Sequence, residues 1–220
     1  MEAQVSTVAE GMPVRPQPDG SDIVKVGEGQ IREVAQALAK AFYDDPIMSW
    51  IFPDDARRME RLVNGFELYV RRVWLPHDES YTTDRVAGVC CWMPPPDAWH
   101  MSIPAQLRLL PAMARMAGRD LPRLMKTLNA MESAHPREPH FYLPMIGVDP
   151  QWQGKGFGAA LMRPVLERCD REESSAYLEA TTPRNRALYE RNGFEFIEEL
   201  KVAKDAPPMW RMWRKPQSTG

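Results

Sequence analysis

A glycine-rich loop, Gln-Gly-Lys-Gly-Phe-Gly-Ala at residues 153–159, carries the plainest chemical signal in the chain. It lies between an apolar segment expected to be a strand, 140–148, and an amphipathic run that begins at Phe157. Backbone N–H groups at the start of a helix bind anions, and glycine lets a phosphate approach the chain closely. Lys155 adds a mobile positive charge. We therefore expect this loop to hold the diphosphate of a cofactor.

The spacing within the loop excludes two common nucleotide-binding loops. Lys155 is not followed by Ser or Thr, as a P-loop requires. Gly154, Gly156 and Gly158 alternate, so the third glycine comes one residue early for the dinucleotide-binding fingerprint. The spacing that does fit is Gln-x-x-Gly-x-Gly, which starts at Gln153.

A second block of residues follows after about one more helix and one strand. It contains Glu179 in an apolar run, then Asn185, then Tyr189 four residues later, and it closes with Gly193-Phe194. The two blocks, in this order, resemble those of the GCN5-related N-acetyltransferases, the GNAT superfamily, whose acetyl-CoA loop reads Gln/Arg-x-x-Gly-x-Gly/Ala.

The resemblance is densest between residues 135 and 216, where it is similar to puromycin N-acetyltransferase and its relatives. The matching residues include His135-Pro136-Arg137-Glu138-Pro139, Pro164, Tyr189-Glu190-Arg191 and Met209-Trp210-Arg211-Met212-Trp213-Arg214-Lys215-Pro216. Residues 23–134 match only in outline. Because the acceptor side of these enzymes is built from that outline region, the resemblance implies the acetyl donor and leaves the acceptor amine open.

The resemblance implies an α/β fold, the GNAT fold, with a central, twisted, mixed sheet flanked by helices. Its fourth and fifth strands, 140–148 and 176–180, begin parallel and splay apart, and acetyl-CoA lies between them. The residues implied to bind this co-substrate are Ile146, Gly147, Val148, Gln153, Gly154, Lys155, Gly156, Phe157, Gly158, Ala159 and Asn185. Arg184 is a further phosphate candidate. Asn185 has a second interpretation, as the cap of the helix that begins near residue 184.

Acetyl transfer from a thioester to an amine needs a proton removed from the ammonium and a proton given to the leaving sulfur. The resemblance implies direct transfer with both substrates held together, so no protein nucleophile is required. We expect Tyr189 to be the general acid, because a phenol with a pKa near ~10 can protonate a thiolate. Glu179 is a candidate general base, and a structural role as acceptor for loop amides is the alternative.

The acceptor site is the part about which the residues say least. Tyr43, Asp44, Asp45 and Trp50 lie in the loop expected after the first helix, where acidic side chains would suit a cationic amine. Helix termination explains them equally well. We expect a small-molecule amine, such as an antibiotic or an amino-nucleoside, since residues 94–133 could cover the groove that a peptide needs. The alternatives are a protein or peptide N-acetyltransferase and a catalytically silent acyl-CoA-binding sensor.

Strands and helices that position these residues are predicted from apolar periodicity. Helices are predicted from Gln30 to the Asp44-Asp45-Pro46 stop, from Asp54 to Val73, in pieces over 97–133, at 157–172 with Pro164 inside, and at 184–191. Strands are predicted at 23–26, 79–82, 85–93, 140–148, 176–180, 193–199 and 208–214. The strand–helix–strand order after the glycine loop predicts a local parallel pairing.

Length and composition are those of an ordinary globular protein, with 220 residues, 44% hydrophobic and 26% charged. We expect a single domain at 22–216, with an acceptor-side half at about 22–134 and an acetyl-CoA-binding half at about 135–216. Disordered tails are expected at 1–21 and 216–220.

Several classes of partner are not expected. The formal net charge is −2 and there is no long basic run, which argues against nucleic acid. No apolar stretch is long enough for a membrane span, and the four histidines share no metal-ligand spacing. Three cysteines, two of them adjacent, fit a reducing, cytoplasmic compartment. We expect a monomer or a homodimer without a metal.

Overall fold

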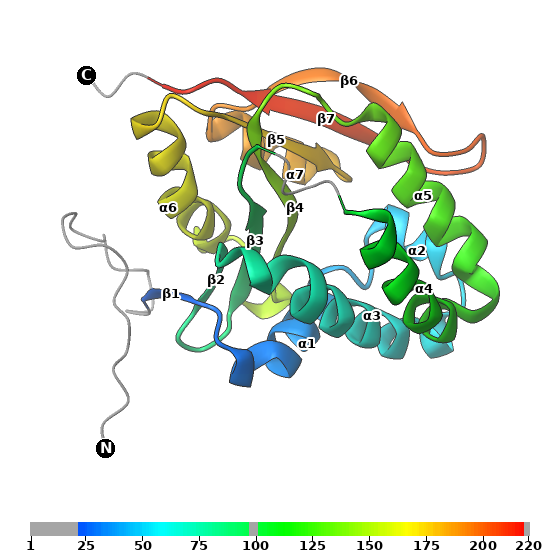
Figure 1. Ribbon diagram of the computed structural model, residues 1–220. Helices are drawn as coiled ribbons and strands as arrows, with labels where there is room; N and C mark the ends of the chain where they lie inside the picture. Colours follow the sequence, from blue (N-terminus) through cyan, green and yellow to red (C-terminus); the bar gives the residue numbers. More distant parts are fainter. Residues whose placement is uncertain (1–21, 97–100, 218–220) are drawn as a thin grey trace.

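A seven-stranded sheet forms the centre of the protein in a computed structural model that describes residues 22–96 and 101–217 (Figure 1). The strand order is β1-β2-β3-β4-β5-β7-β6. Their bounds are β1 Ile23–Lys25, β2 Ser80–Thr83, β3 Gly88–Met93, β4 His140–Val148, β5 Ser175–Ala180, β6 Glu195–Lys201 and β7 Pro208–Arg214. Among the described strands, β4 and β5 form the one parallel pair, and every other neighbouring pair is antiparallel. The predicted mixed sheet is confirmed.

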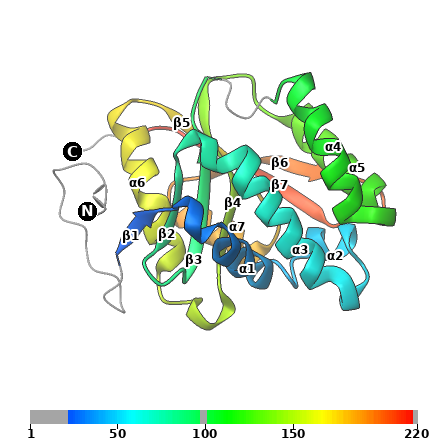
Figure 2. The same cartoon turned by 60° about the horizontal axis from the view of Figure 1, so that its bottom comes forward.

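Helices cover both faces of the sheet (Figure 2). One face carries α1 Ile31–Ala41, α2 Pro46–Ile51, α3 Asp55–Tyr69, α4 Ile103–Ala117 and α5 Leu121–Ala134. The other face carries α6 Phe157–Arg171, and α7 Pro183–Arg191 packs on the same side. Strand β3 is buried along its whole length because it is covered from both sides, which explains why its sequence is an apolar run rather than an alternating one.

Strands β4 and β5 separate soon after they meet. Only His140–Ser175, Phe141–Ala176 and Tyr142–Tyr177 are paired, although β4 continues to Val148 and β5 to Ala180. Directly after the last pair, the register of β4 against β3 shifts, so that Tyr142 lies opposite Met93 and Met145 opposite Cys91. Pro144 lies in this irregular stretch, where its missing N–H costs no ladder hydrogen bond. The predicted splay of the two strands is therefore confirmed, and it begins at the bulge.

The segment after α1 is helical where the sequence analysis predicted a loop. Helix α2 begins at Pro46, and Asp45 caps it by accepting hydrogen bonds from the backbone N–H groups of Ile47 and Met48, at 3.0 and 3.1 Å. The Asp-Pro pair was interpreted only as a stop. It is also a start, because aspartate caps a helix well and proline fits its first position.

Other boundaries differ from the predictions by a few residues. Helix α3 ends at Tyr69 and gives way to a π-helical turn at Val70–Trp74, instead of running on to Val73. Helix α6 continues through Pro164. The C-terminal tail is held as far as Gln217, whose backbone N–H donates to Asp170 Oδ1 at 2.7 Å, so it is not wholly disordered. The predicted tail at 1–21 lies outside the described residues, as do 97–100 of the helical stretch.

None of the helices within the described residues is both long and apolar enough to cross a membrane.

Candidate active site

The open edge of β4 presents backbone groups at the splay. The N–H of Asp149 donates to the carbonyl of Ala87 at 3.0 Å, so the backbone N–H and C=O of Asp149 point toward β3. In an antiparallel pair this direction alternates along the strand, so the backbone groups of Gly147 also point toward β3. Ile146 and Val148 therefore direct theirs to the other edge, which β5 has left. The Val148 carbonyl accepts a hydrogen bond from Gln153 Nε2 at 3.0 Å. Ile146 is the residue of this edge that lies nearest the bulge.

Gly147 and Gly158 are small because helices pack on them. A Cβ at Gly147 would lie 2.9 Å from the Ala41 Cβ, so this glycine allows α1 to approach β4. A Cβ at Gly158 would lie 3.0 Å from Leu188 Cδ2, so this glycine brings α6 against α7. Of the glycines predicted to bind the co-substrate, these two thus have a packing role that the sequence analysis did not foresee.

The glycine loop joins β4 to the N-terminus of α6. Gly154 and Gly156 have φ angles of 79° and 86°, in the left-handed region that glycine adopts without strain. A Cβ at either position would meet nothing within 4 Å, so both glycines border open space. Phe157 is buried and anchors the first turn of α6, whose leading N–H groups lack partners within the helix. The loop therefore has the features of an anion site.

Two polar side chains of this loop are engaged within the protein. Gln153 donates to the Val148 carbonyl and accepts from Arg184 Nη1 at 2.9 Å, so its side chain braces the loop and also engages Arg184. The Lys155 ammonium lies 4.5 Å from the ring centre of Trp152, an attractive cation–π distance. Lys155 remains at the loop, where a long flexible side chain can turn toward a bound anion.

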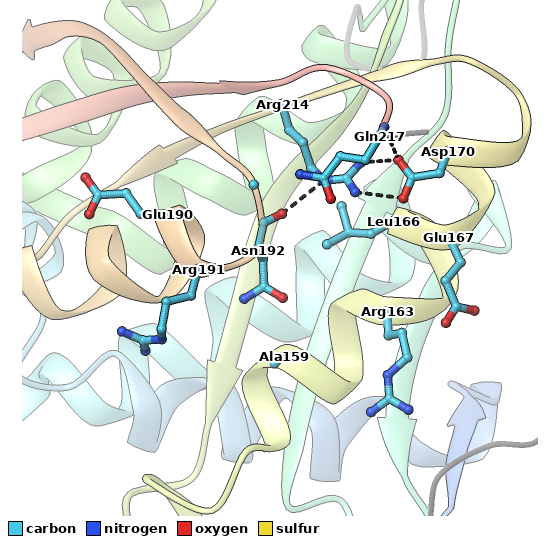
Figure 3. Close-up of a pocket in the computed structure, with 11 residues that line it drawn as sticks. Ala159, Arg163, Leu166, Glu167, Asp170, Glu190, Arg191, Asn192, Arg214 and Gln217 are labelled. Atoms are coloured by element: carbon cyan, nitrogen blue, oxygen red, sulfur yellow. Dashed lines mark hydrogen bonds and ion pairs between the residues drawn. The ribbon is translucent and has the colours of Figure 1, made fainter. Parts of the chain in front are cut away.

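A hollow of about 470 Å³ lies between α6, the end of α7 and the end of β7 (Figure 3). Ala159 lines it at one end, and Arg214 at the other end forms a two-pronged ion pair with Asp170 at 2.7 and 2.8 Å. Of the residues predicted to bind the co-substrate, only Ala159 lines this hollow.

Helix α7 carries Asn185 and Tyr189. Thr182 caps this helix by accepting from the Asn185 backbone N–H at 3.1 Å, so the interpretation of Asn185 as the cap is wrong. Threonine two residues before the helix start explains the cap equally well from the sequence. Tyr189 is buried against Phe194, with ring centres 6.1 Å apart. Burial, with Cys90 and Asp45 as nearby titratable groups, raises the pKa of Tyr189, so its hydroxyl holds its proton firmly.

Glu179 lies on β5 and faces the side of the sheet that α1–α5 cover. The Tyr142 hydroxyl donates to Glu179 Oε2 at 2.9 Å. Although part of the residue reaches the surface, Oε1 is buried and has no hydrogen-bond partner within the described part of the chain. Burial raises the pKa of Glu179 to about 7, against the opposing effect of the Tyr177 and Tyr142 hydroxyls. This carboxylate can therefore gain or lose a proton near neutral pH.

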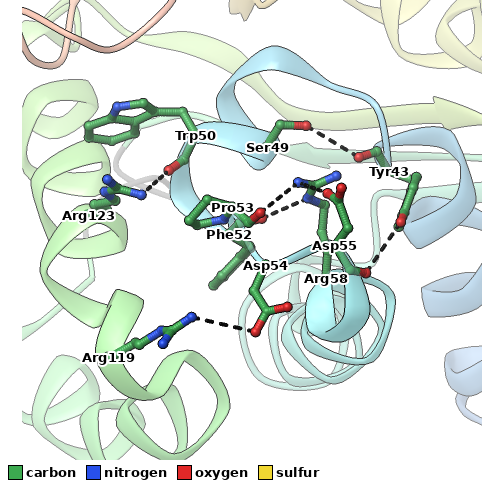
Figure 4. Close-up of polar contacts among 10 residues, drawn as sticks. All are labelled: Tyr43, Ser49, Trp50, Phe52, Pro53, Asp54, Asp55, Arg58, Arg119 and Arg123. Atoms are coloured by element: carbon green, nitrogen blue, oxygen red, sulfur yellow. Dashed lines mark hydrogen bonds and ion pairs between the residues drawn. The ribbon is translucent and has the colours of Figure 1, made fainter.

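The predicted acceptor residues lie in α2 or just before it and are not all brought together; Figure 4 shows two of them, Tyr43 and Trp50. Asp45 is buried, and Thr181 Oγ1 donates to its carboxylate, which links α2 to the end of β5. Trp50 lies in α2 rather than in a loop, and its Nε1 donates to Asp205 Oδ2 at 3.0 Å. Tyr43 instead contacts α3, with its hydroxyl 3.4 Å from the Asp55 carbonyl. Asp44 is exposed.

Trp50 is also held from a third element. Arg123 of α5 donates to the Trp50 carbonyl at 3.1 Å, and its guanidinium carbon lies 5.4 Å from the centre of the indole ring. Helix α2 is thus fastened to α5, to the β6–β7 connection and, through Asp45, to the β5–α7 connection. These contacts hold α2 in place beside the splay.

The sequence analysis missed several polar residues next to Glu179. Arg211 Nε donates to the Tyr177 hydroxyl at 3.0 Å. His135 and His140 approach with their Nε2 atoms 2.9 Å apart. The signal that could have found them is period-2 spacing, because residues two apart on a strand share a face. His140 and Tyr142 are spaced in this way on β4, and Tyr177 and Glu179 on β5. Among the described residues, no three His, Cys, Asp or Glu side chains gather as a metal site would require.

Comparisons with known proteins agree with this arrangement. A family model described as an acetyltransferase (GNAT) domain matches residues 125–196, which include β4, the glycine loop, β5 and α7. An uncharacterized N-acetyltransferase of Schizosaccharomyces pombe is 26% identical over 200 residues, which cover 85% of this chain and 80% of the yeast protein.

Solved structures share the fold. A structure described as histone acetyltransferase HPA2 and related acetyltransferase, from Corynebacterium glutamicum, is 23% identical with a TM-score of 0.67, covering 90% of this chain and 97% of its own. Polyamine N-acetyltransferase of Drosophila melanogaster is 17% identical with a TM-score of 0.57, covering 88% of this chain and 100% of its own. This chain is therefore similar to the GNAT acetyltransferase domain over residues 125–196, similar to the yeast N-acetyltransferase over most of both chains, and shares its fold with the solved structures.

Proposed function

We propose that the protein transfers an acetyl group from acetyl-CoA to a small-molecule amine, directly and with both substrates bound together. The observation that carries this proposal is the splay, where an anion-binding loop, a buried tyrosine and a buried glutamate converge on two separating strands. Tyr189 approaches from the side of α6 and α7, and Glu179 faces the side of α1–α5. The division of the domain into an acetyl-CoA half and an acceptor half, at about residue 135, follows from the same arrangement.

The residues at the loop fit the co-substrate that the family uses. Gly154 and Gly156 border open space beside the free N–H groups of α6, which suits a diphosphate, and Lys155 supplies a positive charge. The outward-facing backbone groups of Ile146 suit the amides of an extended pantetheine arm, as an added strand would. When bound, acetyl-CoA supplies the acetyl group as an activated thioester. Asn185, whose side chain is not the helix cap, is free for the role we assign it on the same arm.

Glu179 is proposed to remove the proton of the acceptor nitrogen through Oε1. A general base works best when its pKa lies near the working pH, and burial places the pKa of Glu179 at about 7. Ionised Glu179 also attracts a cationic amine. We therefore favour the role of general base over that of acceptor for loop amides, because the observed donor to Glu179 is the hydroxyl of Tyr142.

Tyr189 is proposed to donate its hydroxyl proton toward the leaving sulfur. Its raised pKa ensures that the proton is present at any working pH. The same shift makes complete transfer to a thiolate costlier than for a solvent-exposed phenol, so the main contribution is a hydrogen bond that strengthens as charge develops on sulfur.

The acceptor is proposed to be a small cationic amine, in keeping with the polyamine substrate named for the Drosophila neighbour. Helix α2 is tied to Thr181 through Asp45 and to Asp205 through Trp50, and we propose that this fixed helix closes the acceptor side to a peptide. The resemblance to puromycin N-acetyltransferase adds amino-nucleosides to the candidates. The three buried, unpaired cysteines support the cytoplasmic location expected from the sequence.

Release of free thiol from acetyl-CoA, measured with a panel of amines, tests the proposal. The panel contains polyamines, an amino-nucleoside, an aminoglycoside and a peptide with a free N-terminus. We expect turnover with at least one small amine and little with the peptide. Turnover with the peptide alone would point to a protein N-acetyltransferase. Thermal stabilisation by acetyl-CoA with no thiol release from any amine would indicate an acyl-CoA sensor instead.

Replacing Tyr189 by Phe tests the role of its hydroxyl. We expect kcat to fall by about 10- to 100-fold, while acetyl-CoA still raises the melting temperature, because only the hydrogen bond to sulfur is lost. Tyr69→Phe is the matched control, since Tyr69 is a partly buried tyrosine whose hydroxyl donates to the Met113 sulfur, at 3.8 Å. Equal kcat values for Tyr189→Phe and the wild type would rule out the assignment.

A further inference from the structure

Glu179 is held by a set of side chains that has no role in the reaction as described so far. Tyr142 and Tyr177 are the last pair of residues before β4 and β5 separate, so the parallel register places one phenol on each strand beside Glu179. Their ring centres lie 5.8 Å apart. The Tyr142 hydroxyl donates to Oε2 at 2.9 Å, and the Tyr177 hydroxyl, like that of Tyr142, lowers the pKa of the carboxyl against the effect of burial.

Arg211 acts on Glu179 through Tyr177 rather than by contact. It lies on β7, directly opposite Glu179 in the ladder, but its Nε–H donates to the Tyr177 hydroxyl at 3.0 Å. Its Nη1 pairs with Glu198 of β6. A hydroxyl that accepts from a cation becomes a stronger donor, because linked hydrogen bonds polarise one another. The hydrogen bond from Arg211 thus polarises the Tyr177 hydroxyl, which favours the ionised form of Glu179.

The remaining titratable groups around this cluster are His135 and His140. Their rings stand edge-on to the tyrosines, with His135 centred 4.6 Å from Tyr142 and 4.9 Å from Tyr177. His140 Nδ1 lies 2.6 Å from the Glu138 carbonyl, so it carries the hydrogen, and in the neutral ring His140 Nε2 accepts from His135. Burial lowers the pKa of both rings, that of His135 to about 3. They are therefore neutral near pH 7 and pack the two tyrosines into place.

We propose that Tyr142, together with the Tyr177–Arg211 pair, forms a positioning device that engages one side of the Glu179 carboxylate and leaves Oε1 for the acceptor nitrogen. The inference rests on the proposed function, because it supposes that Glu179 is the base. Its geometric support is the contrast between the two oxygens of one carboxylate, since Oε2 has a donor and the buried Oε1 has none in the described residues. A polar atom left unpaired in a folded core is rare and suggests a ligand.

The device has a measurable consequence for proton uptake. Both phenols and Arg211 favour the ionised form of Glu179 and oppose the effect of burial. Loss of either phenol raises the pKa of Glu179, and the acidic limb of the pH profile of kcat/KM moves to higher pH. A residue that served only the fold would lower the amount of active enzyme and leave the position of this limb unchanged.

The test compares Tyr142→Phe and Tyr177→Phe with the wild type, using acetyl-CoA and the best amine of the panel. We expect the acidic limb to move up by about one pH unit in each. Arg211→Gln should move it in the same direction, and Arg211→Lys should restore part of the shift. Tyr81→Phe is the matched control, because Tyr81 also donates to a buried glutamate, Glu79, at 2.7 Å. The inference is wrong if the limb stays in place in both Tyr variants.

A second measurement keeps the inference separate from the proposed function. The Glu179 carboxyl can be titrated directly by carbon-13 NMR, with its signal assigned by comparison with Glu179→Gln. We expect a higher pKa in Tyr142→Phe and Tyr177→Phe than in the wild type, and no change in Tyr81→Phe. An unchanged pKa in both would overturn the inference even if acetyl transfer is observed. Raised values without any acetyl transfer would support the device and contradict the proposed function.

Discussion

Two glutamates, the buried Glu79 and the partly buried Glu179, each accept a hydrogen bond from a tyrosine and each have an arginine nearby. At Glu79, just before β2, Tyr81 donates to Oε2 at 2.7 Å and Arg168 of α6 pairs with Oε1. At Glu179, Tyr142 donates to Oε2 at 2.9 Å, but Arg211 is engaged by Tyr177 and Glu198. One carboxylate therefore has both oxygens satisfied, and the other has one buried oxygen with no partner among the residues that the structure describes.

The difference shows how the same residue types produce a structural or a reactive group. Direct contact with a guanidinium gives a carboxylate a strong, charge-assisted hydrogen bond, which suits a permanent link between α6 and the start of β2. Arg211 instead donates to the hydroxyl of Tyr177, so its charge only partly offsets the cost of burying the Glu179 carboxylate. Burial then raises the pKa of Glu179 to about 7. A group of that kind can exchange a proton with a substrate at neutral pH.

The largest expected effect is on activity. Glu179→Gln should lower kcat/KM by about 100- to 10,000-fold, because a positioned base contributes that much and an amide cannot take the proton. Glu79→Gln is the matched control and should keep kcat/KM close to the wild-type value, since Glu79 lies away from the splay. Rates of thiol release per folded protein measure both. Equal losses of kcat/KM in the two variants would contradict a catalytic role that belongs to Glu179 and not to Glu79.

The second prediction concerns stability: replacing the two glutamates by glutamine should change the unfolding free energy in opposite directions. The folded-state pKa of Glu179, about 7, lies above the ordinary value of 4.5. Between these values the folded state binds more protons than the unfolded one, so this residue costs stability as the pH rises from about 4.5 to about 7. Glu179→Gln removes that cost and should raise the unfolding free energy at pH 8 by up to about 3 kcal/mol, with little change near pH 4.5.

Glu79→Gln should do the opposite and lower the unfolding free energy by about 1 to 3 kcal/mol, because glutamine lacks the charge and keeps one acceptor oxygen for the two donors, Arg168 and Tyr81. Urea unfolding of both variants and the wild type at pH 5 and pH 8 gives the four differences. A Glu179→Gln protein that is less stable than the wild type at pH 8 would show that this carboxylate is structural.

The smallest expected effect comes from the arginine that touches its glutamate. Arg168→Gln should lower the unfolding free energy by about 1 kcal/mol, because Arg168 is partly exposed and shares its charge with Glu172. It should leave the pH profile of kcat/KM in place, whereas Arg211→Gln should move it. A shift of the acidic limb in Arg168→Gln would mean that distant charge, and not the hydroxyl relay, sets the proton affinity of Glu179.

The regions that the sequence predicted best are local in the chain. The glycine loop and the helix after it are specified within a few residues, because turn conformations and helix starts depend on neighbouring backbone. Helix α2 was missed because a proline after an aspartate ends one helix and begins the next with equal ease. The cap of α7 was assigned to Asn185 instead of Thr182 for a related reason, since both residue types cap helices and the helix boundary decides between them.

The setting of Glu179 lay beyond sequence reasoning. Its neighbours come from three strands, with Tyr142 on β4, Tyr177 on β5 and Arg211 on β7. Periodicity indicates which side of a strand each residue shares, but the register between strands decides which residues meet. A shift of one residue would place Tyr142 on the opposite face.

The sequence by itself predicted the strands, most of the helices, the glycine loop and, through its two blocks, the resemblance to acetyl-CoA-dependent enzymes. Tertiary structure alone decided which of two similar glutamates is compensated and which has an oxygen free. The physical reason is the range of the interactions. Backbone conformation is governed by residues adjacent in the chain, whereas the proton affinity of a carboxylate depends on burial and on donors that only the folded sheet brings within about 3 Å.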